Sequence, residues 1–106
     1  MAVNIKLIAE GQLQSTEADL YTVPSGKTAL IKTITLVNGN TSVETINIYI
    51  LKSGSIKRMI APKDFQLGVQ YMAVLDDEFT LEAGDKIRGI TSTAGKVDYT
   101  IHGVEK

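Results

Sequence analysis

The sequence lacks the residue types from which most small metal and catalytic sites are built. Its 106 residues include no cysteine, no tryptophan and a single histidine. Without cysteine there are no disulfides and no thiolate ligands, and one histidine leaves too few ligands for a typical zinc or copper site. We therefore expect no cofactor and no bound metal. The absence of cysteine leaves the redox state of the compartment undetermined.

An excess of charge of one sign and long apolar runs are missing as well. The formal net charge is −1, whereas a surface built to bind nucleic acid is strongly basic. No stretch approaches the length of a membrane span, and residues 1–6 lack the apolar segment of a signal peptide. The composition is that of a globular protein, with neither nucleic acid nor a membrane as a partner. We expect it to stay in the cytoplasm or to join an assembly there.

Period-two alternation of apolar and polar residues recurs along the chain and predicts strands. It favours an all-β fold, an antiparallel, jelly-roll-like β-sandwich of about eight strands without a useful amphipathic helix. We expect a single domain over 1–106, with 1–9 as an N-terminal strand or arm and 20–103 as the sandwich core. Strands are expected at 3–9, 20–23, 28–38, 44–52, 56–60, 69–75, 79–81, 87–91 and 97–103, and the longest connection at 61–68.

The same alternation predicts which side chains share a face of their strand. Leu30 is expected on the face of Ile34, opposite to Ile31. In the first strand, Leu7 is expected on the same face as Ala9.

Residues 25–28, Ser-Gly-Lys-Thr, imitate the end of a nucleotide-binding P-loop. That loop needs a glycine five positions before its Gly-Lys pair, where this chain has Tyr21, and a helix immediately behind it. Here β-branched residues typical of a strand follow Thr28, so a phosphate would find no helix N-terminus. We interpret the segment as a Pro-Gly turn that leads into a strand.

The ionisable residues show no pattern typical of a catalytic or metal site. His102 alternates with Tyr99 and Ile101 and is expected on the solvent side of the last strand. The acidic run 76–78 lacks the Asp-x-Asp-x-Asp-Gly spacing of a calcium loop and is interpreted as a solvated turn. Because no carboxylate has a partner visible in the sequence that would tune its pKa, we expect that the protein is not an enzyme.

Two segments are candidate protein interfaces. One lies in the densest basic stretch and combines residue types favoured at interfaces; a solvated edge or a site for single-stranded nucleic acid are its alternatives. The other lies on one face of the N-terminal strand, which either packs in its own sheet or adds to the edge of a neighbour. The residues of the first candidate are Arg58, Met59 and Phe65, and those of the second are Val3, Ile5 and Leu7.

The stretch 20–34, Leu-Tyr-Thr-Val-Pro-Ser-Gly-Lys-Thr-Ala-Leu-Ile-Lys-Thr-Ile, with Asn38 closing the strand, resembles the opening of small β-sandwich proteins of tailed bacteriophage virions. The segment 79–87, Phe-Thr-Leu-Glu-Ala-Gly-Asp-Lys-Ile, and the ending 99–105 are similar to turns and strands of the same proteins. The resemblance implies a jelly roll that serves as a capsid decoration protein, a head fibre or a tail-associated part. It implies no catalytic residue, because the matching positions are structural.

These features lead us to expect a bacteriophage virion structural protein, a capsid decoration or accessory protein. It would bind the assembled particle as a symmetric oligomer, a homotrimer, and stabilise it. Its partners would be the major capsid protein or other virion proteins, and its location the virion, assembled in the host cytoplasm. The alternative is a tail- or vertex-associated module that binds a receptor carbohydrate or a fibre, with the sugar ring stacked on a tyrosine. The available tyrosines are Tyr21, Tyr49, Tyr71 and Tyr99.

Overall fold

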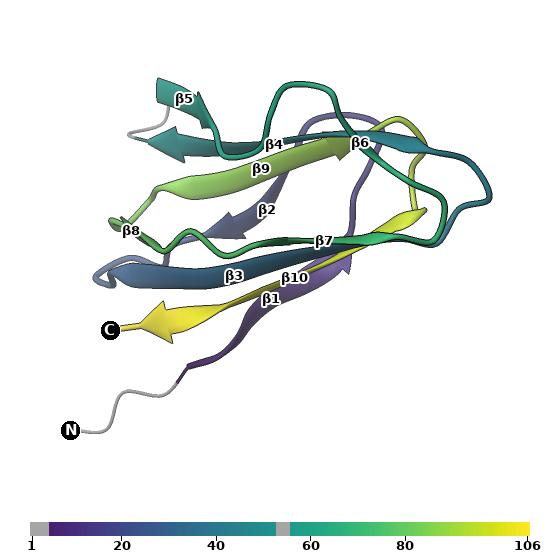
Figure 1. Ribbon diagram of the computed structural model, residues 1–106. Helices are drawn as coiled ribbons and strands as arrows, with labels where there is room; N and C mark the ends of the chain where they lie inside the picture. Colours follow the sequence, from purple (N-terminus) through teal and green to yellow (C-terminus); the bar gives the residue numbers. More distant parts are fainter. Residues whose placement is uncertain (1–4, 53–55) are drawn as a thin grey trace.

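The described residues form ten strands in two antiparallel sheets that lie face to face (Figure 1). The computed structural model describes residues 5–52 and 56–106. Sheet A contains, in spatial order, β1 (Lys6–Gln12), β10 (Val97–Glu105), β3 (Ala29–Asn38) and β7 (Met72–Leu75), with β8 (Phe79–Leu81) also paired to β3. Sheet B contains β2 (Ala18–Thr22), β9 (Lys86–Thr91), β4 (Glu44–Lys52) and β5 (Ile56–Met59), with β6 (Phe65–Leu67) also paired to β4.

The strand order is that of a jelly roll. The first strand pairs with the last, β1 with β10, and the second with the last but one, β2 with β9. Among the strands in the middle of the sequence, β3 pairs with β7 and β8, and β4 pairs with β5 and β6. Eight jelly-roll positions are thus filled by ten strands, because two edge positions are each split into two short strands. The predicted all-β sandwich is confirmed; the prediction that 61–68 contains no strand is wrong, because β6 lies there.

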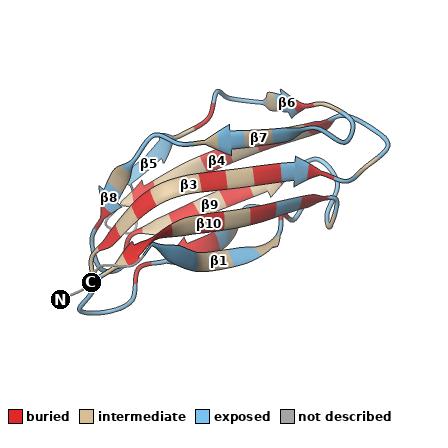
Figure 2. Ribbon diagram, turned by 60° about the horizontal axis from the view of Figure 1, so that its bottom comes forward, coloured by how far each residue is buried: buried red, intermediate tan, exposed pale blue. Residues whose placement is uncertain are grey.

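The hydrophobic core fills the space between the two sheets. Along β3 and β10 buried residues alternate with less buried ones (Figure 2). Leu36 and Ile101 of sheet A belong to the same core cluster as Ile46 and Ile87 of sheet B, and all four are fully buried. Each such side chain stabilises the fold by about 1.5–3 kcal/mol relative to an exposed position. The alternation seen in the sequence is therefore the alternation between core and surface.

A β-bulge in sheet A reverses the predicted faces at the start of β3. Gly103 of β10 pairs with Ile31, while its neighbour His102 pairs with Thr33, so Lys32 is left without a partner. Ile31 consequently faces the core, 1% exposed, together with Ile34. The prediction that these two residues lie on opposite faces is wrong, because the extra residue shifts the alternation by one position.

The close approach of β10 to β3 at this bulge requires a glycine. A Cβ atom on Gly103 would lie 2.2 Å from the carbonyl oxygen of Leu30. No side chain fits at this distance, because the obstacle is backbone. The glycine therefore fixes the position of the bulge.

A second bulge interrupts β1. Leu7 pairs with His102 on the outer face of sheet A, whereas Ala9 pairs with Ile101 on the core side. The prediction that Leu7 and Ala9 share a face is wrong for the same physical reason, since Ile8 is an extra residue between them.

The segment that imitates a P-loop is a turn, as interpreted from the sequence. The backbone N–H of Lys27 donates to the carbonyl of Pro24 at 3.1 Å, and Gly26 has a φ of 77°. β3 begins two residues after Lys27, so no helix N-terminus is present to bind a phosphate. Within the described residues there is no helix long and apolar enough to span a bilayer.

Candidate interaction surface

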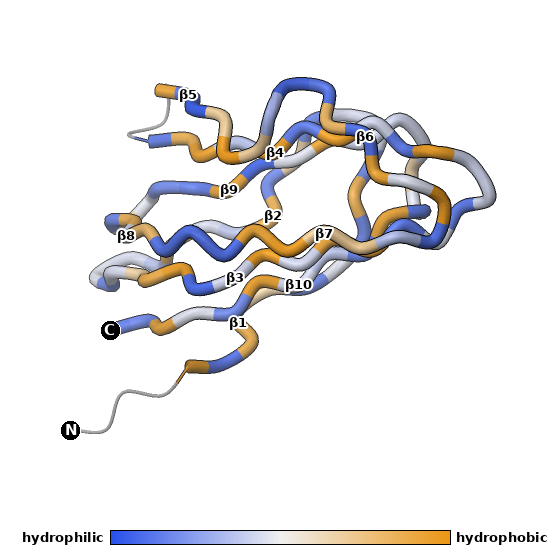
Figure 3. Tube along the Cα trace, in the orientation of Figure 1, coloured by the Kyte–Doolittle hydropathy of each residue, from blue (hydrophilic) through white to orange (hydrophobic). Residues whose placement is uncertain are grey.

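The outer face of sheet A is rich in apolar side chains beside β7. Val37 of β3 pairs with Met72 of β7, and Thr35 with Val74, all on the side away from the core. Met72 is 59% exposed, Val74 50% and Val37 40%. We call these three residues the β7 patch. The tube in Figure 3 shows β7 as an apolar segment at the edge of its sheet. Exposed Tyr71, which immediately precedes β7, extends the apolar surface.

The opposite edge of sheet A also presents apolar side chains. Ile5, which precedes β1, and Leu7 within it are 59% and 49% exposed. Lys6 between them is exposed as well and lies 3.8 Å from the carboxylate of Glu105. Residues 5–7 are therefore an exposed apolar-basic-apolar segment at the edge of sheet A.

The outer face of sheet B carries paired charges instead. Asp19 of β2 lies 2.5 Å from the guanidinium of Arg88 and 3.0 Å from the ammonium of Lys86, both on β9. Lys57 of β5 lies 2.8 Å from Glu17. Burial raises the pKa of Asp19, but its hydrogen bonds and ion pairs with the two cations outweigh this and leave the pKa below its ordinary value. Such exposed pairs suit a solvated surface.

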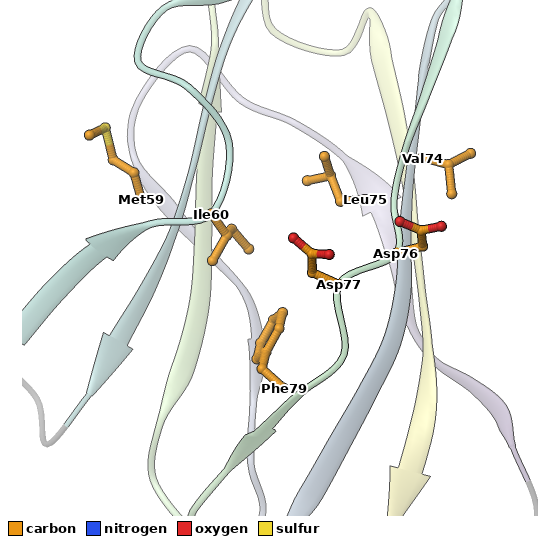
Figure 4. Close-up of a pocket in the computed structure, with 7 residues that line it drawn as sticks. All are labelled: Met59, Ile60, Val74, Leu75, Asp76, Asp77 and Phe79. Carbon is orange, nitrogen blue, oxygen red and sulfur yellow. The ribbon is translucent and has the colours of Figure 1, made fainter.

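A groove opens between the sheets at the split edge strands. It has a volume of about 380 Å³ and lies between the end of β5 and the segment that joins β7 to β8. In Figure 4, Ile60, Asp77 and Phe79 converge on its middle, whereas Val74 and Asp76 lie on the outer side of their strand. The residues that line the groove are Met59, Ile60, Val74, Leu75, Asp76, Asp77 and Phe79.

The acidic run 76–78 is the segment that splits the edge of sheet A. Glu78 forms an ion pair with Lys32, the unpaired residue of the bulge. Asp76 and Asp77 are exposed and form no ion pair or hydrogen bond within the described part of the chain. No group of three or more histidine, cysteine, aspartate or glutamate side chains in 5–52 and 56–106 is placed to hold a metal ion.

Two carboxylates in the described part of the chain are buried, Glu44 and Asp85, and the burial of Glu44 was not predicted from the sequence. Glu44 is 1% exposed and accepts hydrogen bonds from Asn40 Nδ2 at 2.9 Å, Thr91 Oγ1 at 2.8 Å and the backbone N–H of Thr93 at 2.8 Å. Burial alone would raise its pKa, but these donors outweigh burial and lower the pKa of Glu44 to about 2.

Glu44 has a structural function. It joins the β3–β4 connection to the end of β9, and both of its carboxylate oxygens accept hydrogen bonds from groups of the protein itself. Its position in phase with the buried Ile46 and Ile48 was the available signal.

Three of the four tyrosines are engaged within the protein. Tyr21 donates to the carboxylate of Glu105 at 2.6 Å, and buried Tyr99 donates to the carbonyl of Leu20 at 3.2 Å. The ammonium of Lys57 lies 4.4 Å from the ring centre of Tyr49. Tyr71, 70% exposed, presents an open ring.

The two interface segments predicted from the sequence lie at different edges. Ile5 and Leu7 are exposed at sheet A, and Val3 lies outside the described residues. Arg58 and Met59 are exposed on β5, and Met59 lines the groove, but Phe65 on β6 packs against the core. His102 lies on the outer face of sheet A between β1 and β3. Whether these segments bind a partner remains a prediction.

No protein-family model matches the sequence, and no curated protein sequence is significantly similar to it. Solved structures are similar in fold. One is from the Bacillus endospore appendages described as disulfide-linked pili, with a TM-score of 0.56, 12% identity, and coverage of 98% of this chain and 85% of that chain.

Two further similar structures come from infectious bursal disease virus. A chain of its T13 viral particle gives a TM-score of 0.53 at 11% identity, and a chain of its derived T=1 particles gives 0.53 at 14% identity. This chain is covered to 97% and 98%, but it spans only 30% of each viral chain. At these identities the likeness establishes a shared β-sandwich fold.

Proposed function

We propose that the protein is a structural component of a virus particle, of the tailed-bacteriophage type. It binds the outside of the assembled shell as a symmetric homo-oligomer, a trimer, stabilises the shell, and catalyses no reaction. Its partner is the major capsid protein or another virion protein, and its location is the virion, reached after assembly in the host cytoplasm. The observation that carries this proposal is the outer face of sheet A.

That face has the chemistry of an interface rather than of a solvated surface. The β7 patch contains three apolar side chains that are 40–59% exposed, and exposed Tyr71 immediately precedes it. The outer face of sheet B carries ion pairs instead. Protein interfaces are depleted of charged residues at their centre and enriched in methionine and aromatic residues. Contiguous exposed apolar patches on a small protein mark interaction sites.

The protein acts by binding to the shell and not by a chemical reaction. Each subunit contributes a modest contact, and an oligomer repeats that contact at equivalent positions on the shell lattice, so that avidity makes attachment tight. Because the assembled shell is bound in preference to its free subunits, binding stabilises it by mass action.

The ionisable residues support a role without catalysis. Glu44 is occupied by internal hydrogen-bond donors, and His102 lies on a strand face rather than in the groove. A disulfide-linked assembly like that of the pili is excluded for this chain, because it has no cysteine.

The test is co-sedimentation of the purified protein with virions, followed by measurement of its copy number per particle. We expect saturable binding at a copy number comparable with that of the shell protein. Failure of the wild-type protein to sediment with particles overturns the proposal. A copy number of only a few per particle replaces decoration by attachment at a tail or vertex.

The tail- or vertex-associated binding module is a second candidate, and the open ring of Tyr71 favours it. Sugar rings stack on such exposed aromatic faces. Saccharide binding on a glycan array that is lost in Tyr71→Ala selects this candidate.

A further inference from the structure

The two edges of sheet A have compatible strand directions. From β1 through β10 and β3 to β7, every neighbouring pair is antiparallel. With four strands in this order, β1 and β7 run in opposite directions. A second copy displaced sideways along the sheet therefore brings its β1 next to β7 of the first copy in the antiparallel sense. No strand of the described residues occupies the far side of β7 or of β1.

The rows of paired residues show which positions then become level. Leu7 pairs with His102, and His102 with Thr33. Ile34, the residue after Thr33, pairs with Leu75, the last residue of β7. Continued by one residue, this register places Asp76 level with Thr33. The neighbouring copy's Leu7 would accordingly arrive at the segment that begins with Asp76.

The adjacent row leads to the same place. Lys6 pairs with Gly103, Gly103 with Ile31, and Ile31 with Phe79 of β8. Lys6 is thus level with Phe79, a lining residue of the groove. Both rows from the start of β1 end at the split between β7 and β8, where the groove opens.

The chemistry of the two edges is complementary. The groove is apolar at Leu75 and Phe79 and has two unpaired carboxylates, Asp76 and Asp77. The start of β1 offers Leu7 and the exposed ammonium of Lys6. Alternation along the strands puts Lys6 and Asp77 on the core side of the sheet, and Leu7 and Val74 on its outer side. Phe79 and Asp76 are the directly opposed residues, so the ammonium of Lys6 would meet the carboxylate of Asp77 diagonally, and Leu7 would meet Val74 diagonally.

We propose that the groove between β5 and β7 binds the Ile5-Lys6-Leu7 segment of a second copy of this chain, which extends sheet A across the subunit boundary. The contact is heterologous, because two different edges meet, and it closes into a ring or grows into a filament. It rests on the proposed function in that it supplies the oligomer that decorates the shell.

A complementation experiment tests the proposal. Leu7→Asp blocks the β1 edge, and Val74→Asp places a carboxylate beside the groove; both residues are about half exposed, so the fold tolerates the changes. Sedimentation velocity and light scattering give the mass. We expect the wild type to form oligomers as concentration rises and each variant to remain at the mass of one chain, 11.5 kDa.

A mixture of the two variants is the decisive sample. The intact β1 edge of Val74→Asp fits the intact groove of Leu7→Asp, while the two altered edges repel each other. The mixture should therefore form 1:1 dimers and nothing larger. Ile56→Asp, a substitution of a similarly exposed residue on β5 of sheet B, is the matched control and should assemble like the wild type.

Exchanging the charges of Lys6 and Asp77 tests the same contact without changing the apolar surface that it buries. Lys6→Glu and Asp77→Lys should each weaken association at least tenfold, and the double variant should recover most of it. The proposal is overturned by a wild type that stays monomeric at millimolar concentration, by variants that assemble normally, or by a variant mixture that stays monomeric.

The experiment also separates this proposal from the proposed function. Wild-type protein that sediments with virions but does not self-associate retains the virion role and overturns the copy-to-copy contact. Protein that self-associates through the two edges but does not bind particles retains the contact and overturns the virion role.

Discussion

The outer faces of the two sheets obey the same alternation but differ in chemistry. On sheet B, Asp19 is paired with Lys86 and Arg88, so the face satisfies its own charges. On sheet A, Met72 and Val74 are at least half exposed and have no apolar neighbour that covers them. Sheet B satisfies its charges within the monomer, whereas the outer face of sheet A leaves apolar side chains exposed and is the surface that we propose for interaction.

The edges of the sheets add to this contrast. The edge positions of β5–β6 and β7–β8 are each split, which shortens the row of free backbone groups that another chain could pair with. Short edge strands limit indiscriminate aggregation, and the groove at the split is where we propose that one partner segment binds.

The largest expected effect comes from removing the bulge that shapes sheet A. Gly103→Ala forces a Cβ atom against the Leu30 carbonyl, 2.2 Å away. We expect a loss of about 3 kcal/mol in the free energy of unfolding, measured by urea denaturation. Gly39→Ala, whose Cβ would lie 3.5 Å from its nearest neighbour, is the control and should cost less than half as much. Equal losses would contradict the close packing described for β10 and β3.

The next effect contrasts the buried charge of Glu44 with that of an exposed carboxylate, Glu82. The folded pKa of Glu44, about 2, lies below the ordinary value of 4.5, so its stabilising contribution is full above pH 4.5 and is lost as pH falls through about 2. Glu44→Gln should lower the free energy of unfolding by about 2–3 kcal/mol at pH 7 and flatten its decline between those pH values. Thermal unfolding over a pH series measures this. The exposed Glu82→Gln serves as control; a Glu44→Gln profile parallel to the wild type would refute the assignment.

Particle binding should distinguish the β7 patch from the β5 edge of sheet B. Met72→Glu puts a charge in the β7 patch, and we expect its affinity for virions to fall at least about tenfold, or about 1.4 kcal/mol. Ile56→Glu on sheet B should change the affinity less than about twofold. Titration of virions with labelled protein gives both values. The reverse ranking would move the docking surface to β5, where Arg58 and Met59 lie.

The smallest effect is expected for the ion pairs of sheet B. Asp19→Asn removes the partner of Lys86 and Arg88, all partly exposed, and should cost about 0.5–1 kcal/mol. The loss should shrink in 1 M salt, because screening weakens exposed pairs. Denaturant titrations of Asp19→Asn and wild type at two salt concentrations measure it; a large, salt-independent loss would show that Asp19 has a role in packing.

Sequence patterns predicted most of the fold but only part of the candidate surface. The N-terminal strand packs in its own sheet against β10 and leaves Ile5 and Leu7 exposed, and their role as an interface stays a prediction. The β7 patch was missed, because alternation indicates that Met72 and Val74 share a face but not which face is covered. Phe65 could not be assigned to the core, because β6 is too short for a periodic signal. Glu44 was missed because its donors, Thr91 and Thr93, are remote in the sequence.

The sequence by itself determined the fold class of the protein. Alternation, turn residues and the absence of cysteine require a β-sandwich held together by its apolar core, because local preference and period act within a few residues. Tertiary structure alone decided the two bulges, the split edges, the groove and the pairing of Glu44. Each of these depends on which strands become neighbours in space, and that follows from the packing of residues up to a hundred positions apart.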